Sequence, residues 1–220
     1  MSDYDTILKT VYLVRHGHSE HNIAPIFQAK GAALSNTGRK QASKIAKRAT
    51  DLKIDTLMAS PLPRAKETAI IIGKALGKEP VYSEIFVERK IPTLIQGKPY
   101  EDIEANKLWR EWEASFYKPG VHVADGENYD DIIARADLAI AHLNDQTSES
   151  ILVVSHGGLI RTIVARILMG DSLTAELLEK FHNVASIENT GITVLKYRAG
   201  FEDTAKWRLT SYNDHSHLAN

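Results

Sequence analysis

The chain of 220 residues contains no cysteine. This absence excludes disulfide bonds, thiolate metal sites and cysteine nucleophiles together. The chain also has no excess of charge of one sign, since 27 lysines and arginines balance 28 aspartates and glutamates to a net charge of −1. The basic residues do not gather into a positive face, so the charge pattern favours neither nucleic acid nor an anionic membrane as a partner. We therefore expect a small-molecule partner.

Long hydrophobic runs are absent as well. No apolar run approaches the ~20 residues that a membrane-spanning helix needs. The first five residues carry two aspartates and no basic side chain, and no apolar segment typical of a secretory signal follows them. These observations predict a cytoplasmic protein without a membrane span. The length suits one α/β domain, and we expect residues 1–220 to form it.

Apolar residues recur at strand spacing and at helix spacing in alternation along the chain. The predicted strands cover residues 11–14, 56–59, 151–154, about 191–197 and 207–212, and the predicted helices cover 37–52, 63–76, 100–112, 129–143 and 159–169. Such alternation predicts a mostly parallel sheet with helices on both faces. From about 83 to 127 the alternation breaks down, which indicates an insertion that covers the active site.

Two strands end at a histidine. The run Val11–Val14 leads into Arg15, His16 and Gly17, and the run 151–154 leads into Ser155, His156 and Gly157. Arg64 follows the strand predicted between them. Because ligands of parallel sheets bind beyond the carboxyl ends of the strands, these two histidines and two arginines predict one phosphate site.

The chemistry of these residue types points to phosphoryl transfer. A neutral imidazole attacks phosphorus, and burial beside two guanidinium groups lowers the pKa of His16 in the required direction. Its other ring nitrogen needs an acceptor, such as a backbone carbonyl, and Gly17 permits the close turn. Arg15 and Arg64 match phosphoryl oxygens with planar, bidentate forks.

Neutral donors and a proton source complete the predicted site. Asn22 and the backbone amides of Gly17 and Gly157 are expected to bind phosphate oxygens, while His156 faces the same phosphate from another strand. The leaving oxygen needs a proton, for which we select Glu88 and hold Glu84 in reserve. The scheme requires no metal and no cofactor.

Four segments in order resemble the histidine phosphatase superfamily, the phosphoglycerate mutase-like branch 1 group. The matching stretches are Arg15-His16-Gly17-His18-Ser19-Glu20-His21-Asn22, Leu34-Ser35-Asn36-Thr37-Gly38-Arg39-Lys40-Gln41-Ala42, Ser60-Pro61-Leu62-Pro63-Arg64-Ala65-Lys66-Glu67-Thr68-Ala69 and Val154-Ser155-His156-Gly157-Gly158-Leu159-Ile160-Arg161. The resemblance implies a three-layer α/β/α fold, a phosphorylated His16, Glu88 as proton donor, and Arg15, Asn22, Arg64 and His156 as phosphate ligands.

The chain departs from this family at position 18, which is histidine rather than glutamate or glutamine, and in residues 88–97, which only partly resemble the family's acid-bearing segment. The lid of the mutases is shortened or rearranged, so the resemblance favours a phosphatase of small phosphomonoesters over a phosphoglycerate mutase-type phosphotransferase. Gly126-Glu127-Asn128 is similar to the family's Gly-Glu-Ser element, which implies that this turn lies near the site.

Two further alternatives come from other classes. The spacing of His16, His18, Glu20 and His21 is close to the His-x-His-x-Asp-His pattern of metallo-hydrolases. No other histidine precedes His122, however, and the neighbouring arginines would repel a divalent cation. A catalytically silent module that binds a phosphorylated ligand is the other alternative, although such a module has no need of nucleophile, acid and second histidine together.

Overall fold

The computed structural model describes residues 6–20, 25–27, 31–198 and 206–219. Their six strands form one sheet in the order β3-β2-β4-β1-β5-β6. The strands are β1 (Ile7–Arg15), β2 (Thr56–Ala59), β3 (Val81–Tyr82), β4 (Ser150–Ser155), β5 (Ile192–Arg198) and β6 (Lys206–Asp214). The first four strands pair in parallel, and β5 and β6 extend one edge of the sheet through two antiparallel pairings, which confirms the mostly parallel sheet.

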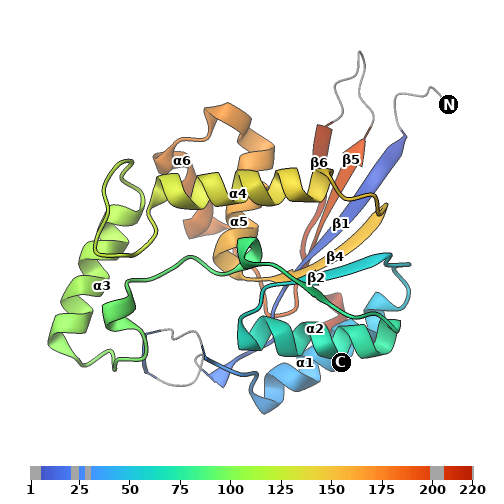
Figure 1. Cartoon of the computed structure of the whole chain (residues 1–220), viewed down its shortest axis with the longest axis horizontal. Helices are drawn as coiled ribbons and strands as arrows, with labels where there is room; N and C mark the ends of the chain where they lie inside the picture. The colour runs from blue at the N-terminus through green and yellow to red at the C-terminus, as the bar shows by residue number, and fades with distance from the viewer. Residues whose placement is uncertain (1–5, 21–24, 28–30, 199–205, 220) are drawn as a thin grey trace.

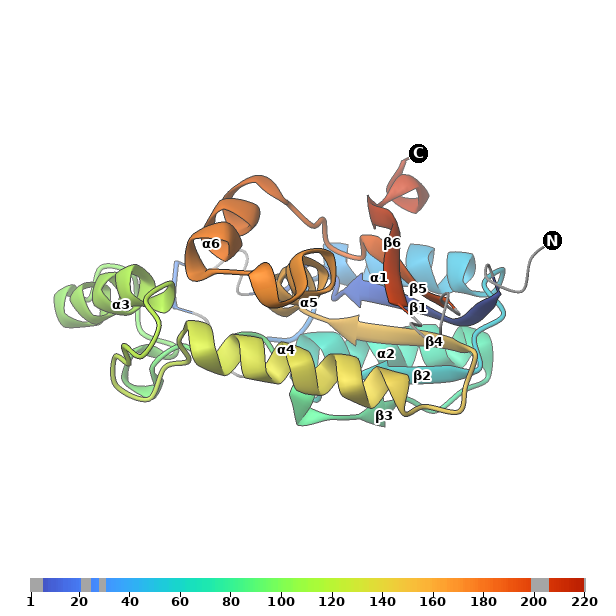
Figure 2. The ribbon, with the colours of Figure 1, turned by 90° about the horizontal axis from the view of Figure 1, so that it is seen from above.

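Helices cover both faces of this sheet. They are α1 (Asn36–Ala49), α2 (Pro63–Leu76), α3 (Ile103–Phe116), α4 (Tyr129–Asn144), α5 (Gly157–Met169) and α6 (Ala175–Val184). Helices α1 and α2 lie on one side of the sheet, and α4 and α5 lie on the other (Figure 1). Helix α3 stands away from the sheet, at one end of the molecule in both views (Figure 2). The predicted α/β/α layering is confirmed.

Alternation within the central strands builds two separate cores. In β4, Ile151 and Val153 pack with α4 and α5, whereas Leu152 and Val154 pack with α1 and α2. All four side chains are fully buried. Successive side chains of a strand point to opposite faces, so a central strand that is apolar at every position serves both cores.

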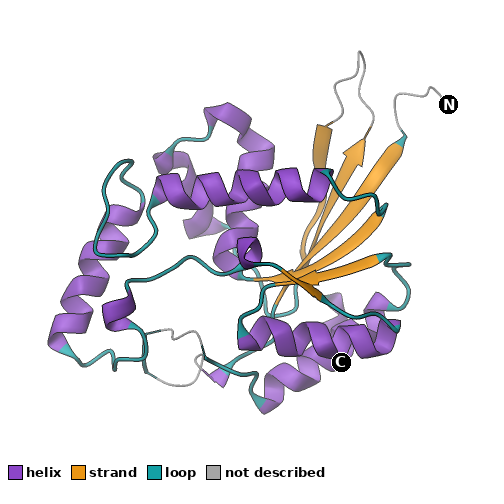
Figure 3. Cartoon of the chain, viewed as in Figure 1, coloured by secondary structure: helices purple, strands orange, loops and turns teal. Residues whose placement is uncertain are grey.

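The segment between β3 and α4 carries little regular structure apart from α3 (Figure 3). The helix predicted at 100–112 begins later, at Ile103, because the Asp102 side chain accepts a hydrogen bond from Ala105 N and caps it. The short edge strand β3 and the ten-residue helix α6 were not predicted. Two exposed residues give no strand periodicity. Helix α6 does carry an amphipathic pattern, with Thr174 as its N-cap and Leu178 and His182 buried one turn apart, and this signal was overlooked.

The N-terminal ends of α2, α5 and α4 fix the positions of residues that the sequence singles out. Pro63 occupies the first turn of α2, so that Arg64 follows immediately, and α5 begins directly after His156. Asn128 and Asp131 form a capping box that fixes the start of α4. Within the described ranges, no helix combines the length and the apolar character needed to cross a bilayer.

Candidate active site

The carboxyl ends of two adjacent parallel strands bring the predicted residues together. Arg15 ends β1 and His16 follows it, while His156 follows β4. The two imidazole centroids lie 5.0 Å apart. Arg64, at the start of α2, places its Nε 3.1 Å from His16 Nε2. Segments far apart in the chain therefore meet at one buried centre.

His16 is held in one tautomer. Its Nδ1 lies 2.7 Å from Gly17 O, and a carbonyl accepts hydrogen bonds only, so Nδ1 carries the proton. Nε2 then presents a lone pair, which Arg64 Nε contacts. Burial, followed by the charges of Arg64, His156 and Arg15, lowers the pKa of His16 well below its usual 6.5. This imidazole is neutral at ordinary pH, and its unprotonated Nε2 accepts a hydrogen bond from Arg64 Nε. An unprotonated ring nitrogen of this kind has the lone pair that nucleophilic attack needs.

His156 is fully buried and held by a hydroxyl. Its Nε2 lies 2.8 Å from Ser60 Oγ. Burial and the charge of Arg64 also lower the pKa of His156 well below 6.5. Its Nδ1 is buried and has no hydrogen-bond partner among the described residues. A buried polar atom of this kind marks a place for a ligand oxygen.

Arg15 is anchored at one end and unsatisfied at the other. Its Nη1 donates to Ile187 O at 2.5 Å, whereas its buried Nε finds no acceptor in the described part of the chain. Asn189 Nδ2 donates to His16 O at 2.9 Å, so the loop before β5 supports both residues. Sequence reasoning missed this loop, because it contains no recognisable motif. Two unsatisfied donors, Arg15 Nε and His156 Nδ1 when protonated, suit an anion.

The Gly17 amide, which is predicted to bind phosphate, has a protein acceptor in this structure. Its N–H donates to Thr68 Oγ1 at 3.1 Å, and Thr68 in turn donates to Arg64 O, so the amide serves the turn rather than a ligand. A Cβ at Gly17 would lie 2.7 Å from Gly38 O, which explains the glycine. Gly157 is the first residue of α5, where backbone N–H groups lack intrahelical acceptors. Asn22 lies outside the described residues.

Glu88 reaches this centre from the irregular segment. Its carboxylate accepts hydrogen bonds from Arg89 N at 3.0 Å and Gly158 N at 3.2 Å. Burial raises the pKa of Glu88, but the Arg89 N hydrogen bond and the Arg64 charge outweigh burial, and the net shift is downward. A Cβ at position 158 would stand 2.4 Å from Glu88 Oε1, so the carboxylate occupies the space that Gly158 leaves. Glu84 is exposed.

Two cavities adjoin Glu88. One, of about 290 Å³, is bordered by Arg64 as well as Glu88. The other, of about 220 Å³, is bordered by Arg161, Trp109 and Tyr100. Both also touch Arg89 and Ile91, and neither is large. Together they offer room for a small leaving group beside the carboxylate.

The histidines of the metal-site alternative do not converge. His18 Nδ1 lies 2.9 Å from Ser35 Oγ, and His16 faces a guanidinium instead of another ligand. In residues 6–20, 25–27, 31–198 and 206–219, no three His, Asp or Glu side chains group as metal ligands. His21 lies outside these ranges. This arrangement does not support the metallo-hydrolase alternative.

Comparison with known proteins gives one consistent result. The profile of the histidine phosphatase superfamily (branch 1) matches residues 11–215. "Phosphoglycerate mutase-like protein 4" of Arabidopsis thaliana is 31% identical over 214 residues, covering 94% of this chain and 86% of that protein. A Bacillus subtilis (strain 168) protein named "Uncharacterized phosphatase PhoE" is 28% identical, covering 96% and 98%.

A solved structure agrees in fold. A mutant of phosphoserine phosphatase from Entamoeba histolytica, in complex with phosphoserine, superposes with a TM-score of 0.72 at 25% sequence identity. The superposition covers 96% of this chain and 99% of that one. The phosphoglycerate mutase-like fold expected from the sequence is thereby confirmed.

Proposed function

Because this chain belongs to the histidine phosphatase superfamily (branch 1), we propose that it is a metal-independent phosphomonoester hydrolase acting through a phosphohistidine at His16. One observation carries the proposal. His16 Nδ1 is bound to Gly17 O while Nε2 lies 3.1 Å from a guanidinium nitrogen, so a neutral nucleophile already faces a phosphate-binding cation.

In the first step, His16 Nε2 attacks phosphorus, and the bond between phosphorus and the ester oxygen breaks. Glu88, in its protonated form, gives a proton to the departing oxygen. The like charge of a bound phosphate raises the pKa of Glu88 from its low value in the free protein, which favours this protonated form. The product alcohol departs, and His16 remains phosphorylated at Nε2.

In the second step, the Glu88 carboxylate takes a proton from water, and the water oxygen attacks phosphorus. The nitrogen–phosphorus bond breaks, inorganic phosphate forms, and Nε2 regains its lone pair. Arg15 and Arg64 neutralise the charge on the equatorial oxygens in both steps. We assign supporting hydrogen bonds to His156, Asn22 and the Gly157 amide.

A small phosphorylated metabolite is the proposed substrate. The cavities beside Glu88 measure only about 290 and 220 Å³, which favours a compact leaving group. Phosphoserine bound to the Entamoeba phosphatase is of that size. The balanced charge supports neither nucleic acid nor a membrane as a partner, and we expect the cytoplasm as the location.

A phosphoglycerate mutase-type phosphotransferase is the second candidate, favoured by the name of the Arabidopsis relative. A mutase would interconvert 3-phosphoglycerate and 2-phosphoglycerate in dependence on bisphosphoglycerate. A phosphatase instead releases inorganic phosphate without that requirement. Measuring both products from the same incubation separates the two.

The test is phosphate release from a panel of phosphomonoesters between about pH 5 and pH 8, with and without a chelator. We expect release that survives chelation, an acid-labile phosphoenzyme, and a loss of at least ~10⁴-fold in His16→Ala, as for other removed nucleophiles. An active His16→Ala variant would refute the mechanism. Activity abolished by the chelator would favour a metallo-hydrolase, and no release from any ester would favour a silent binding module.

A further inference from the structure

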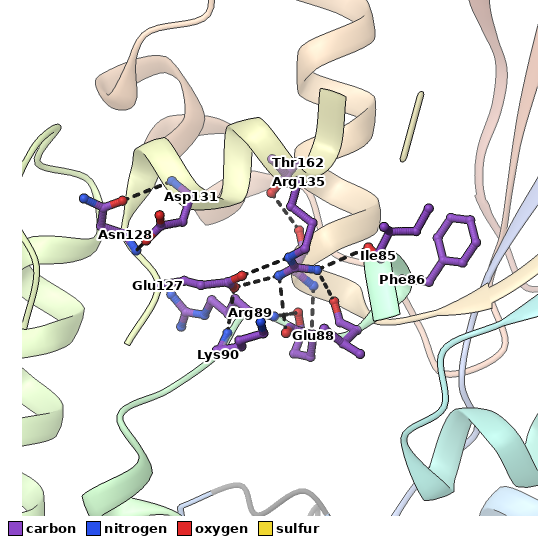
Figure 4. Close-up of polar contacts among 12 residues, drawn as sticks. Ile85, Phe86, Glu88, Arg89, Lys90, Glu127, Asn128, Asp131, Arg135 and Thr162 are labelled. Atoms are coloured by element: carbon purple, nitrogen blue, oxygen red, sulfur yellow. Dashed lines mark hydrogen bonds and ion pairs between the residues drawn. The ribbon is translucent and has the colours of Figure 1, made fainter. Parts of the chain in front are cut away.

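The segment that carries Glu88 has almost no regular structure of its own. It follows a 3₁₀ turn that ends at Phe86. Phe86 and Ile91 are buried in the core, and Ser155 Oγ donates to Phe86 O at 2.8 Å, but the backbone between them belongs to no helix or strand. One side chain makes several contacts with this segment. Arg135, from the middle of α4, donates through Nη1 to Val87 O at 2.5 Å and through the same nitrogen to Ile85 O at 3.4 Å (Figure 4).

Arg135 also reaches the proton donor's own backbone. Its Nη2 lies 3.4 Å from Glu88 O. The guanidinium thus spans the carbonyls of Ile85, Val87 and Glu88, which belong to the segment that leads up to the Glu88 side chain and to Glu88 itself. Arg135 makes no hydrogen bond to His16 or to the carboxylate of Glu88, and the structure describes both residues. Its charge helps to lower the pKa of His156, an effect on the phosphate side that both kinds of ester share. An effect on proton donation by Glu88 passes through the backbone.

Glu127 holds Arg135 and the other flank of the segment. Arg135 Nε and Nη2 donate to the two carboxylate oxygens of Glu127 at 2.9 and 2.6 Å, and both side chains are only 10% exposed. Lys90 N donates to Glu127 Oε2 at 2.8 Å, and Glu127 N donates to Lys90 O at 2.8 Å. Glu88 therefore lies between two anchors that are joined to one another (Figure 4).

Helix α3 contacts Glu127 and also the residue that follows Glu88. Trp112 Nε1 donates to Glu127 O at 2.8 Å. Arg89 stacks over the rings of Trp112 and Phe116, with its Cζ 4.6 and 4.7 Å from the centroids, and pairs with Glu113 at 2.9 Å. The residue after Glu88 is thus fixed to α3, and the residues before it are fixed to α4.

We propose that the buried Arg135–Glu127 pair is a positioning pair that holds the Glu88 carboxylate in place for proton transfer. This inference rests on the proposed function. A general acid must lie within about 2.6–3.2 Å of the oxygen that it protonates, and small displacements are costly. A segment with little secondary structure does not supply that accuracy by itself, whereas a bidentate ion pair bound to several backbone groups does.

The experiment compares two near-isosteric esters that differ in their need for a proton. p-Nitrophenolate leaves phosphorus readily without protonation, whereas the alkoxide from p-nitrobenzyl phosphate does not. The measured quantity is kcat/KM, which covers steps up to leaving-group departure and omits the later hydrolysis of the phosphohistidine. Glu88→Gln serves as the reference for full loss of the acid.

For Arg135→Met we expect kcat/KM to fall about 10-fold to 100-fold further with the benzyl ester than with the phenyl ester, part of the ~10²–10⁴ that a general acid supplies. Glu88→Gln should also lose more kcat/KM with the benzyl ester than with the phenyl ester, and the difference between the two losses should be larger than in Arg135→Met. Arg135→Lys keeps a charge but not the planar fork, and should lie between Arg135→Met and the wild type.

Arg166→Met is the matched control. Arg166 pairs with Asp137 of α4 at 2.7 Å and with Asp171 at 2.9 Å, and it donates to Gly170 O. It makes no hydrogen bond to residues 85–90, all of which the structure describes, so its loss weakens these contacts and leaves the Glu88 segment in place. We expect equal, small changes with both esters. Circular dichroism and thermal unfolding of each variant establish the folded fraction used in the rates.

Equal losses with both esters in folded Arg135→Met would overturn the positioning role. Should Arg135→Met fail to fold, Glu127→Gln replaces it, because the amide retains the shape and one acceptor; absence of ester selectivity there would overturn the proposal equally. If the wild type released no phosphate from either ester or from the wider panel, the proposed function itself would fail. The two failures are therefore distinguishable.

Discussion

The two sides of the site are built differently. On the nucleophile side, Arg15, His16 and His156 sit at or just beyond the ends of central strands, and Arg64 sits in the first turn of a helix. On the acid side, Glu88 lies on an irregular segment that is fixed by a buried ion pair from α4. Strand ends and a helix start thus position the proposed nucleophile. The proposed acid depends instead on the Arg135 and Glu127 side chains, which hold its backbone, and on the N–H of Gly158, which holds its carboxylate. Substitutions on the two sides should have different signatures.

The largest effect in this comparison should come from Arg64, which contacts His16 and which we propose as a phosphate ligand. We expect Arg64→Met to lower kcat/KM by about 10²–10³-fold, the magnitude seen when one preorganised charge donor is removed. Both aryl and alkyl esters should be affected alike. Steady-state kinetics with the two nitro-substituted esters checks this.

Arg64→Lys sharpens the result, because lysine keeps the charge without the fork that places Nε against His16 Nε2. A variant with wild-type rates would show that charge alone is needed at this position. A loss confined to alkyl esters would place Arg64 on the acid side and break the comparison.

A smaller effect is expected at Gly158. An alanine Cβ there would stand 2.4 Å from Glu88 Oε1, so the carboxylate must move. We expect Gly158→Ala to lower kcat/KM for the alkyl ester about 10-fold, a fraction of a general acid's ~10²–10⁴, with little change for the aryl ester. Gly31→Ala is the control, since its added Cβ meets nothing within 4 Å. Unaltered alkyl kinetics in Gly158→Ala would contradict the geometry.

The smallest effect concerns stability. Burial lowers the pKa of His16 below the unfolded value of about 6.5, so the unfolded chain binds the proton first as the pH falls. The contribution of His16 to the free energy of unfolding is therefore complete above about pH 6.5 and is lost progressively as the pH falls below that value. Its slope is at most about 1.4 kcal/mol per pH unit.

Urea unfolding at about pH 7.5, pH 6 and pH 5 measures this contribution. His16→Ala should lose less stability than the wild type between the two acidic conditions. If the free energy of unfolding changed equally with pH in both proteins, His16 would not be the source of this pH dependence. The comparison of slopes also cancels the contributions of histidines that both proteins retain.

The difference between the two sides explains what the sequence could and could not predict. A buried strand followed by Arg-His-Gly fixes a position in the fold, because the strand is apolar at every residue and its end is marked. The same reasoning located His156. Arg135 gave no such signal, since a charged residue in the middle of an amphipathic helix usually faces solvent. The resemblance of Gly126-Glu127-Asn128 to a family element implied that this turn lies near the site, but it did not indicate a partner for Glu127.

Backbone partners were the hardest to foresee. A sequence pattern supplied Thr68 as part of a motif but not its hydrogen bond to Gly17 N, and the amide was therefore assigned to phosphate. Ile187 O and Asn189 meet Arg15 and His16 only through the return of the chain to β5. Contacts between segments that are distant in the sequence are not visible in the local composition or residue spacing.

The hydroxyl of Ser60 has one more consequence. A carbonyl beside an imidazole dictates which nitrogen is protonated, but a hydroxyl turns and can either give or take the hydrogen. His16 is thus confined to a single tautomer, whereas the Ser60 hydroxyl accepts either tautomer of the neutral His156. Two neighbouring imidazoles are therefore held differently: the first presents a fixed lone pair, and the second can present either a lone pair or an N–H at Nδ1, according to the oxygen placed beside it.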